Sequence, residues 1–118
     1  MNMIETLALK AIDMIGYPRS LDELYRLVIP KDICRKIGIC EGDYLEFCDW
    51  DWGKSHILLA YKPVKNQPTD VINLTRKLDS LGRIVIPREI CRHTNLHPCD
   101  TLEIFVFKKG YILLRKGE

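Results

Sequence analysis

The sequence predicts a mainly β fold with short helices, in which two β-β-α-β-β repeats share one core. Residues 19–47 and 76–104 carry the same pattern, and 14 of their 29 aligned pairs are identical. A duplication of this size has to be recognised before a fold is assigned. The chain has 118 residues, which suffice for one compact domain but not for two ordinary ones. We therefore expect two interleaved halves that form one domain.

Segment 1–13 precedes the first repeat, and we expect a short amphipathic helix in it. Apolar residues from Ile4 to Ile15 recur at helical spacing, and Ala, Leu, Glu and Lys favour helices. The simplest role for this helix is to cover one edge of the domain. The alternative role is to form a dimer or to bind a partner.

The repeats are expected at 14–61 and 71–118, with a linker at 62–70. Alternating apolar residues predict half-buried strands at 15–21 and 72–78. Further strands are expected at 43–48, 56–61, 84–87, 100–107 and 111–116. The linker is assigned because 63–70 holds two prolines and polar neighbours without apolar periodicity.

Each repeat contains a turn, a short strand and then a helix that begins at a proline suited to the first helical position. Gly38 and Asn95 stand at equivalent helix ends, and both residue types adopt the left-handed cap readily. The turns differ, because Gly82 can take a positive φ at little cost and its counterpart Tyr25 cannot. The first hairpin must therefore turn differently or accept strain.

The charges are segregated along the chain, although the net charge of +2 is too small to indicate nucleic acid. The stretch from Arg76 to Arg92 holds five basic and two acidic residues, whereas Glu41 to Asp51 holds five acids and no base. This distribution predicts a positive surface near each turn. No nucleophile–base pair, phosphate loop or pair of carboxylates in an apolar pocket is present, so we expect no catalysis.

Five cysteines without a secretory signal indicate reduced thiols. Cys34 and Cys91 are equivalent, and we expect small buried hydrophobic residues there. A zinc site built from Cys91, His93, His97 and Cys99 is the alternative, but its spacing matches no usual zinc motif, so we expect no metal and no cofactor.

No apolar run is long enough to span a membrane, and we expect a cytoplasmic protein without a membrane partner. Trp50 and Trp52 are candidates for exposed aromatic residues. We expect them to pack over the rim of the core, and stacking on a partner or a base is the alternative.

The segment RKLDSLGRIVIPREICR, from Arg76 to Arg92, together with the following DTLEI and KKGYILLRK, resembles the AbrB/SpoVT/MazE swapped-hairpin DNA-binding domain. The resemblance covers roughly 45 residues of each half. Family members usually carry one unit per chain, and a chain with two units is similar to the MraZ arrangement. The resemblance implies an AbrB-like double-split β-barrel, built here as an intramolecular pseudo-dimer, in a DNA-binding transcriptional regulator.

The resemblance also implies which residues contact DNA, namely basic residues around each turn and the following helix. These are Arg19, Arg26 and Arg35 in the first half and Arg76, Lys77, Arg83, Arg88 and Arg92 in the second; Lys31 and Lys36 are nearby candidates for phosphate contacts. The alternative for any single one is a solvated surface charge. The expected target is double-stranded, AT-rich, imperfectly palindromic DNA with unequal half-sites.

Two alternatives concern the use of this domain. An antitoxin would carry the same DNA-binding unit, usually with a disordered acidic tail that wraps a toxin, whereas Gly117 and Glu118 end this chain. For the same reason we expect no C-terminal sensor domain, and a homo-oligomer would have to use the N-terminal segment or exposed sheet edges. Because of Tyr25, one half could also have lost DNA binding and serve only to complete the fold.

Overall fold

The computed structural model describes residues 2–50, 52–62, 74–107 and 110–117. The described helices are α1 (Met3–Ala11), α2 (Lys31–Ile37) and α3 (Arg88–Thr94), with a short 3-10 turn, η1 (Trp52–Lys54). The described strands are β1 (Tyr17–Ser20), β2 (Arg26–Val28), β3 (Tyr44–Asp49), β4 (His56–Lys62), β5 (Thr75–Lys77), β6 (Arg83–Val85), β7 (Thr101–Phe107) and β8 (Tyr111–Lys116). Apart from Lys62, the linker predicted at 62–70 lies outside the described residues.

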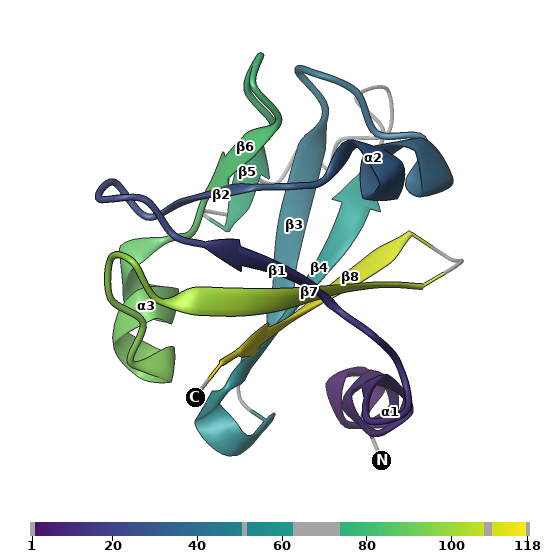
Figure 1. Ribbon diagram of the computed structural model, residues 1–118, viewed down its shortest axis with the longest axis vertical. Helices are drawn as coiled ribbons and strands as arrows, with labels where there is room; N and C mark the ends of the chain where they lie inside the picture. The colour runs from purple at the N-terminus through teal and green to yellow at the C-terminus, as the bar shows by residue number, and fades with distance from the viewer. Residues whose placement is uncertain (1, 51, 63–73, 108–109, 118) are drawn as a thin grey trace.

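Six strands form one antiparallel sheet in the order β1-β7-β8-β4-β3-β5, and β2 pairs with β6 in a separate ribbon (Figure 1). Many of these pairings join the two halves of the chain: β1 lies on β7, β5 on β3, β4 on β8 and β2 on β6. The register of β1 on β7 is equivalent to that of β5 on β3. Ser20 faces Thr101 in the first pair and its counterpart Lys77 faces Tyr44 in the second, and counterparts are 57 positions apart in the sequence. The halves are thus related by an approximate two-fold axis.

The main core lies between the inner face of the six-stranded sheet and the β2–β6 ribbon. Leu27 and Ile84 face each other at the centre of the ribbon and are fully buried. They pack in one cluster with apolar side chains of both halves, including Leu59 and Ile112 from the central strands. Burial of this apolar surface from both halves is the main force that joins them.

Helix α1 covers the opposite face of the sheet. It contacts β4 and β8, and its four buried residues pack on Leu58, Phe105 and Leu113. The prediction that this helix covers an edge was wrong, because the sheet edges are β1 and β5 and the helix lies over the central strands. The reason is that these three side chains form an apolar patch on the outer face, which the helix shields from water.

Two local predictions also need correction. Ile15 was expected to face inward in a strand, yet it is 96% exposed, because residues between α1 and β1 form a connection and the strand begins only at Tyr17. Pro30 and Pro87 were expected at the first helical position. They lie one residue earlier, as N-caps with ψ of 142°, which is an extended conformation that a helix interior does not adopt.

The two hairpin turns have the same backbone conformation despite their different sequences. Tyr25 has φ of 59° and Gly82 has φ of 75°, and the amide of each donates to the carbonyl of the aspartate three residues earlier. The first hairpin therefore keeps the turn and accepts the left-handed strain. Gly38 and Asn95 both adopt the predicted left-handed cap.

Candidate nucleic-acid interface

Each hairpin turn is built around an aspartate that binds an arginine four residues later. In the first half, Asp22 Oδ1 accepts from the amides of Leu24 (2.9 Å) and Arg26 (2.8 Å). Asp22 Oδ2 accepts from Arg26 Nε at 2.6 Å. One carboxylate therefore closes the turn and also holds the guanidinium group that follows it.

The second half repeats these bonds almost atom for atom. Asp79 Oδ1 accepts from the amides of Leu81 and Arg83, and Asp79 Oδ2 accepts from Arg83 Nε at 2.7 Å. In both turns the bond from the arginine's backbone N–H has the largest effect on the pKa of the aspartate, and it lowers that pKa. Burial opposes this shift, but the bonds from the arginine side chain and from the second amide add to it, so the pKa is lowered on balance. Both carboxylates are thus held in the charged form that binds the arginine.

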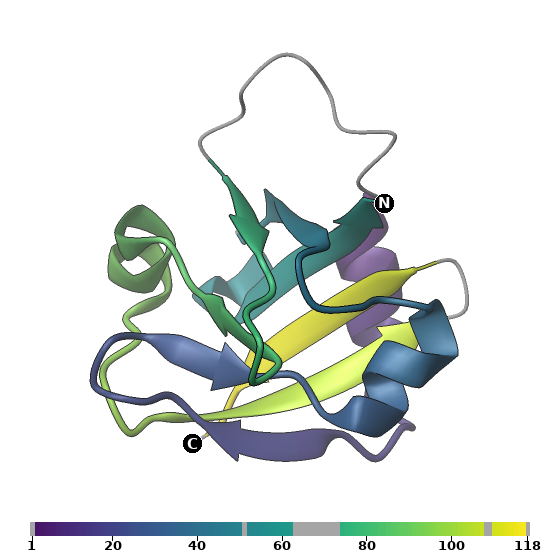
Figure 2. The ribbon, with the colours of Figure 1, turned by 90° about the horizontal axis from the view of Figure 1, so that it is seen from above.

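The β2–β6 ribbon brings the two braced arginines onto one surface. Arg26 lies opposite Val85, and Val28 lies opposite Arg83. The side chains of Arg26 and Arg83 are 30% and 26% exposed. Figure 2 shows α2 and α3 flanking this ribbon on opposite sides.

The other predicted contact residues are distributed around this ribbon rather than gathered with it. Arg19 is on the edge strand β1, and Arg76 and Lys77 are on the other edge strand, β5. The remaining three are exposed on helices: Arg35 on α2, and Arg88 and Arg92 on α3. Arg35 also lies 3.4 Å from Asp32, and Lys77 lies over the Tyr44 ring.

A groove of about 480 Å³ joins parts of the two halves beside the ribbon. Arg19 and Lys31 of the first half line it together with the Asp79–Gly82 turn of the second half. This contact accompanies the pairing of strands between the halves, which places the turn of one half against the helix of the other. The basic residues of the first half are therefore close to the turn of the second.

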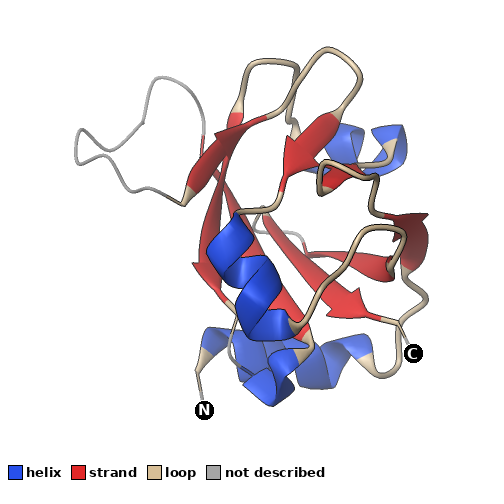
Figure 3. Ribbon diagram, turned by 90° about the vertical axis from the view of Figure 1, so that its left-hand side faces the viewer, coloured by secondary structure: helices blue, strands red, loops and turns tan. Residues whose placement is uncertain are grey.

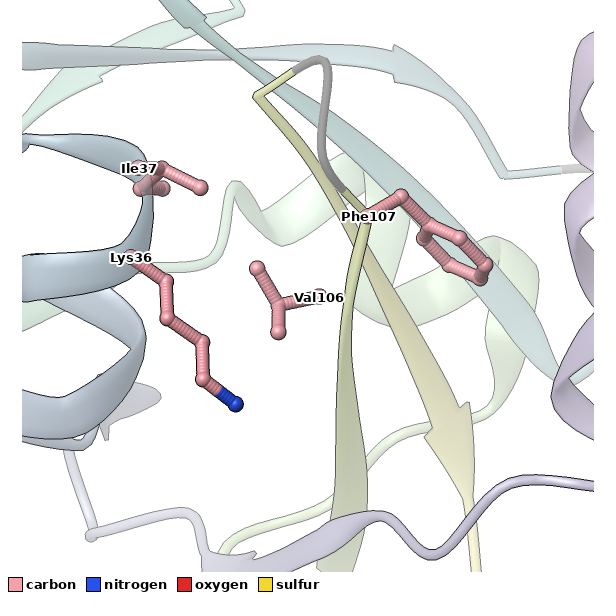
Figure 4. A pocket seen from close by; sticks show the side chains of 4 residues that line it. All are labelled: Lys36, Ile37, Val106 and Phe107. Carbon is pink, nitrogen blue, oxygen red and sulfur yellow. The ribbon is translucent and has the colours of Figure 1, made fainter.

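Two further cavities lie at equivalent places where a helix meets a long strand of the other half. Figure 4 shows the first, of about 380 Å³, where Lys36 and Ile37 on α2 face Val106 on β7, while the ring of Phe107 points to the other side of the strand. The second, of about 340 Å³, lies between α3 and the end of β3. Its lining residues are Cys48, Asp49, Trp50 and His93. The first cavity thus combines an ammonium group with apolar walls, whereas the second is polar and aromatic.

The two tryptophans and Cys91 are packed against apolar side chains, whereas Cys34, which was also expected to be buried, is only half-buried. Trp50 packs against the main core, and Trp52 packs against the α1 cluster, which confirms that both lie at the core rim. Cys91 is buried, and desolvation raises the pKa of its thiol to about 11. Its Sγ points toward the Ile86 carbonyl oxygen at 3.8 Å, away from the exposed Cys99 of the zinc alternative. Among the described residues, no three histidine, cysteine or acidic side chains gather as metal ligands.

The sequence predicted the arginines as contact residues but did not point to the residues that position and surround them. Asp22 and Asp79 were not singled out, although both copies carry an aspartate four positions before the arginine. That shared spacing was the available signal. Val85 was predicted only as part of the strand at 84–87, and both it and its counterpart Val28 are 42% exposed on the ribbon.

Similarity to known proteins covers part of the chain. No protein-family model matches it. Stage V sporulation protein T of Bacillus subtilis (strain 168) is 46% identical over 43 residues, which are 36% of this chain and 24% of that protein. The match spans about a quarter of the relative's length and supports a likeness to the AbrB/SpoVT family within that stretch.

One solved structure is similar over most of the chain. The solution structure of PHS018 from Pyrococcus horikoshii matches over 88% of this chain and 89% of its own, with a TM-score of 0.46 and 14% sequence identity. No helix among the described residues is long and apolar enough to cross a membrane. Figure 3 shows the short helices placed around the outside of the strands.

Proposed function

We propose that this protein is a DNA-binding transcriptional regulator of the AbrB/SpoVT type. In this proposal the halves 14–61 and 71–118 form an intramolecular swapped-hairpin pseudo-dimer that contacts double-stranded DNA. The observation that carries it is the pair Arg26 and Arg83, each held by an aspartate at equivalent positions of one exposed ribbon. The similarity to stage V sporulation protein T supports the family.

The braced arginines suit contact with nucleic acid. Each aspartate accepts from Nε, so the two terminal amino groups of the guanidinium can bond two phosphate oxygens or the acceptor edge of a guanine. A lysine would offer only a point charge. The exposed basic residues on β1, β5, α2 and α3 would add phosphate contacts around the ribbon.

The proposed target follows from the approximate two-fold relation of the halves. Such a protein fits an imperfect palindrome, because equivalent residues of each half would contact equivalent positions. The halves differ at Tyr25 and Gly82 and at Ser20 and Lys77, so the half-sites should be unequal. AT-rich, flexible DNA would allow the duplex to adapt to the ribbon and the basic residues around it.

Binding to a random, AT-biased duplex pool across a salt series tests this function. The wild type should bind with an affinity that falls steeply as salt rises, because each phosphate contact adds about 0.9 to the slope of log affinity against log salt. Arg83→Glu should weaken binding strongly. Lys10→Glu is the matched control, since it makes the same change of charge on α1, across the sheet from the ribbon.

The outcome that would contradict the proposal is a wild type that binds no duplex at low salt while circular dichroism shows it folded. Equal loss of binding in Arg83→Glu and Lys10→Glu would also contradict it, because only net charge would then matter. In the same assay, Arg26→Ala compared with Arg83→Ala shows whether both halves contact DNA. No loss in Arg26→Ala would restrict the interface to the second half.

A further inference from the structure

The outward face of the β2–β6 ribbon has an alternating pattern of charged and apolar side chains. Successive residues of a strand point to opposite faces, and Leu27 and Ile84 point into the core with no exposed surface. Arg26 and Val28 therefore point outward on β2, as do Arg83 and Val85 on β6. The register places each valine directly opposite the arginine of the other strand.

The two valines expose apolar surface at the place where the arginines are presented. Each is 42% exposed, the same value in both halves, and neither belongs to the buried core. The fold does not require an apolar side chain there, because threonine would meet the strand preference equally well. Apolar groups flanked by arginines on an outward face indicate a ligand that offers both acceptors and apolar groups.

The aspartates keep the guanidinium groups from covering the valines. Arg26 Nε and the Arg26 amide both donate to Asp22, which lies in the turn that precedes β2. The guanidinium is thus drawn back toward its own turn. The same bonds hold Arg83 toward Asp79, so the valines on the outward face of the ribbon stay open to a ligand.

We propose that Val28 and Val85 contact the C5-methyl groups of thymines in the major groove and so select the sequence that this ribbon binds. The inference rests on the proposed DNA-binding function and adds the residues that would recognise bases. The major groove, about 12 Å wide, admits a two-stranded ribbon with strands about 4.8 Å apart. The thymine methyl is the apolar group on its base edges, and arginine is the common partner of guanine there.

The pairing within the ribbon predicts where the thymines lie. The central pair Leu27 and Ile84 lies on the approximate two-fold axis, so the valines are equivalent about it. Residues two apart on a strand are separated by about 6.7 Å, close to two base-pair steps. Each arginine faces a valine, so each half-site should place a thymine next to the position that the arginine contacts.

Replacement of thymine by deoxyuracil tests the proposal, because it removes only the methyl groups. The probe is a duplex selected by the wild type from a random pool and then synthesised with either base. Binding should weaken about four-fold when one valine is deprived of its thymine methyl, and about fifteen-fold when both are. Val28→Ser/Val85→Ser should bind both duplexes equally, with an unchanged salt slope because no charge is altered.

Leu24→Ser/Leu81→Ser is the matched control. These leucines are 64% and 66% exposed at the hairpin tips, and the control should keep the wild-type preference for thymine. The inference is overturned if the wild type binds both duplexes equally, or if the valine variant keeps the preference; the proposed function then stands. If the wild type binds neither duplex at low salt, the proposed function fails as well. Should the double variant not fold, the wild-type comparison and the single variants still decide.

Discussion

At the scale of single residues, three aligned backbone positions of the repeated segments 19–47 and 76–104 have a positive φ in both halves, with glycine in one half and another residue in the other. Gly82, Gly38 and Gly42 have Tyr25, Asn95 and Cys99 as their counterparts, all with positive φ. A non-glycine residue in this region costs about 1 to 2 kcal/mol. Tyr25 and Cys99 therefore adopt the conformation that glycine takes at Gly82 and Gly42, and the rest of the structure has to offset the strain.

His56 makes the stability of the fold depend on pH. Its ring is 6% exposed, its Nδ1 lies 3.3 Å from the Trp52 carbonyl oxygen, and burial, with the nearby charge of Arg115, lowers its pKa. As pH falls below about 6.5, the unfolded chain takes up a proton before the folded one does, so the free energy of unfolding decreases until the folded pKa is passed. One such group contributes at most about 1.4 kcal/mol per pH unit.

Urea unfolding between about pH 7 and about pH 5 measures this dependence. The free energy of unfolding of His56→Gln should change less with pH than that of the wild type, because the glutamine does not titrate. His97→Gln is the control, since His97 is exposed. An unchanged pH profile in His56→Gln would show that other groups cause the dependence.

At the scale of elements, the contact between α1 and the sheet depends on one aromatic side chain. Phe105 is 1% exposed on β7 and packs with α1 residues, and its ring lies 4.8 Å from the Arg115 guanidinium. Gly16 also lies against it, since a Cβ there would be 2.9 Å from Phe105 Cζ. The helix therefore covers a surface that would otherwise expose this ring to water.

Phe105→Ala should lower the free energy of unfolding by about 3 to 5 kcal/mol, because it removes a buried ring and leaves a cavity under α1. Urea denaturation followed by circular dichroism measures the loss. Leu81→Ala is the control, and at 66% exposure it should change stability by less than about 0.5 kcal/mol. If Phe105→Ala lowers the free energy of unfolding by less than about 1 kcal/mol, α1 and the sheet must move together and fill the cavity.

The strands and helices were largely predictable, because prolines, left-handed caps and apolar alternation mark them in both copies. The surface that α1 covers was not, since a helical stripe shows which side is buried but not which partner buries it. Arg26 and Arg83 were predicted through the family resemblance. Their hydrogen bonds to Asp22 and Asp79 were not, because a charge pattern does not distinguish a solvated arginine from a braced one.

At the scale of the whole molecule, four strand pairings join the halves, and the linker is not needed to hold them together. A specific protease site introduced within 63–73 should therefore yield fragments that remain associated after cleavage. The melting temperature of the cleaved protein should rise with protein concentration, because folding then requires association. The melting temperature of the intact chain should not depend on protein concentration.

Gel filtration and thermal melts at two concentrations measure both effects. Fragments that separate under native conditions would contradict the pairing between the halves. A concentration-dependent melting temperature of the intact chain would show instead that two chains exchange equivalent halves.

The pairing of β1 with β7 has a consequence for synthesis on the ribosome. Tyr17 faces Ile104, so a strand made near the start of translation has no partner until most of the chain has emerged. At about 5 to 20 residues per second, the 87 residues that separate Tyr17 from Ile104 correspond to a wait of about 4 to 17 seconds. During that time the first half has unpaired strand edges and no complete core. A nascent chain that terminates before β7 should therefore be a substrate for chaperones or proteases rather than a folded half-protein.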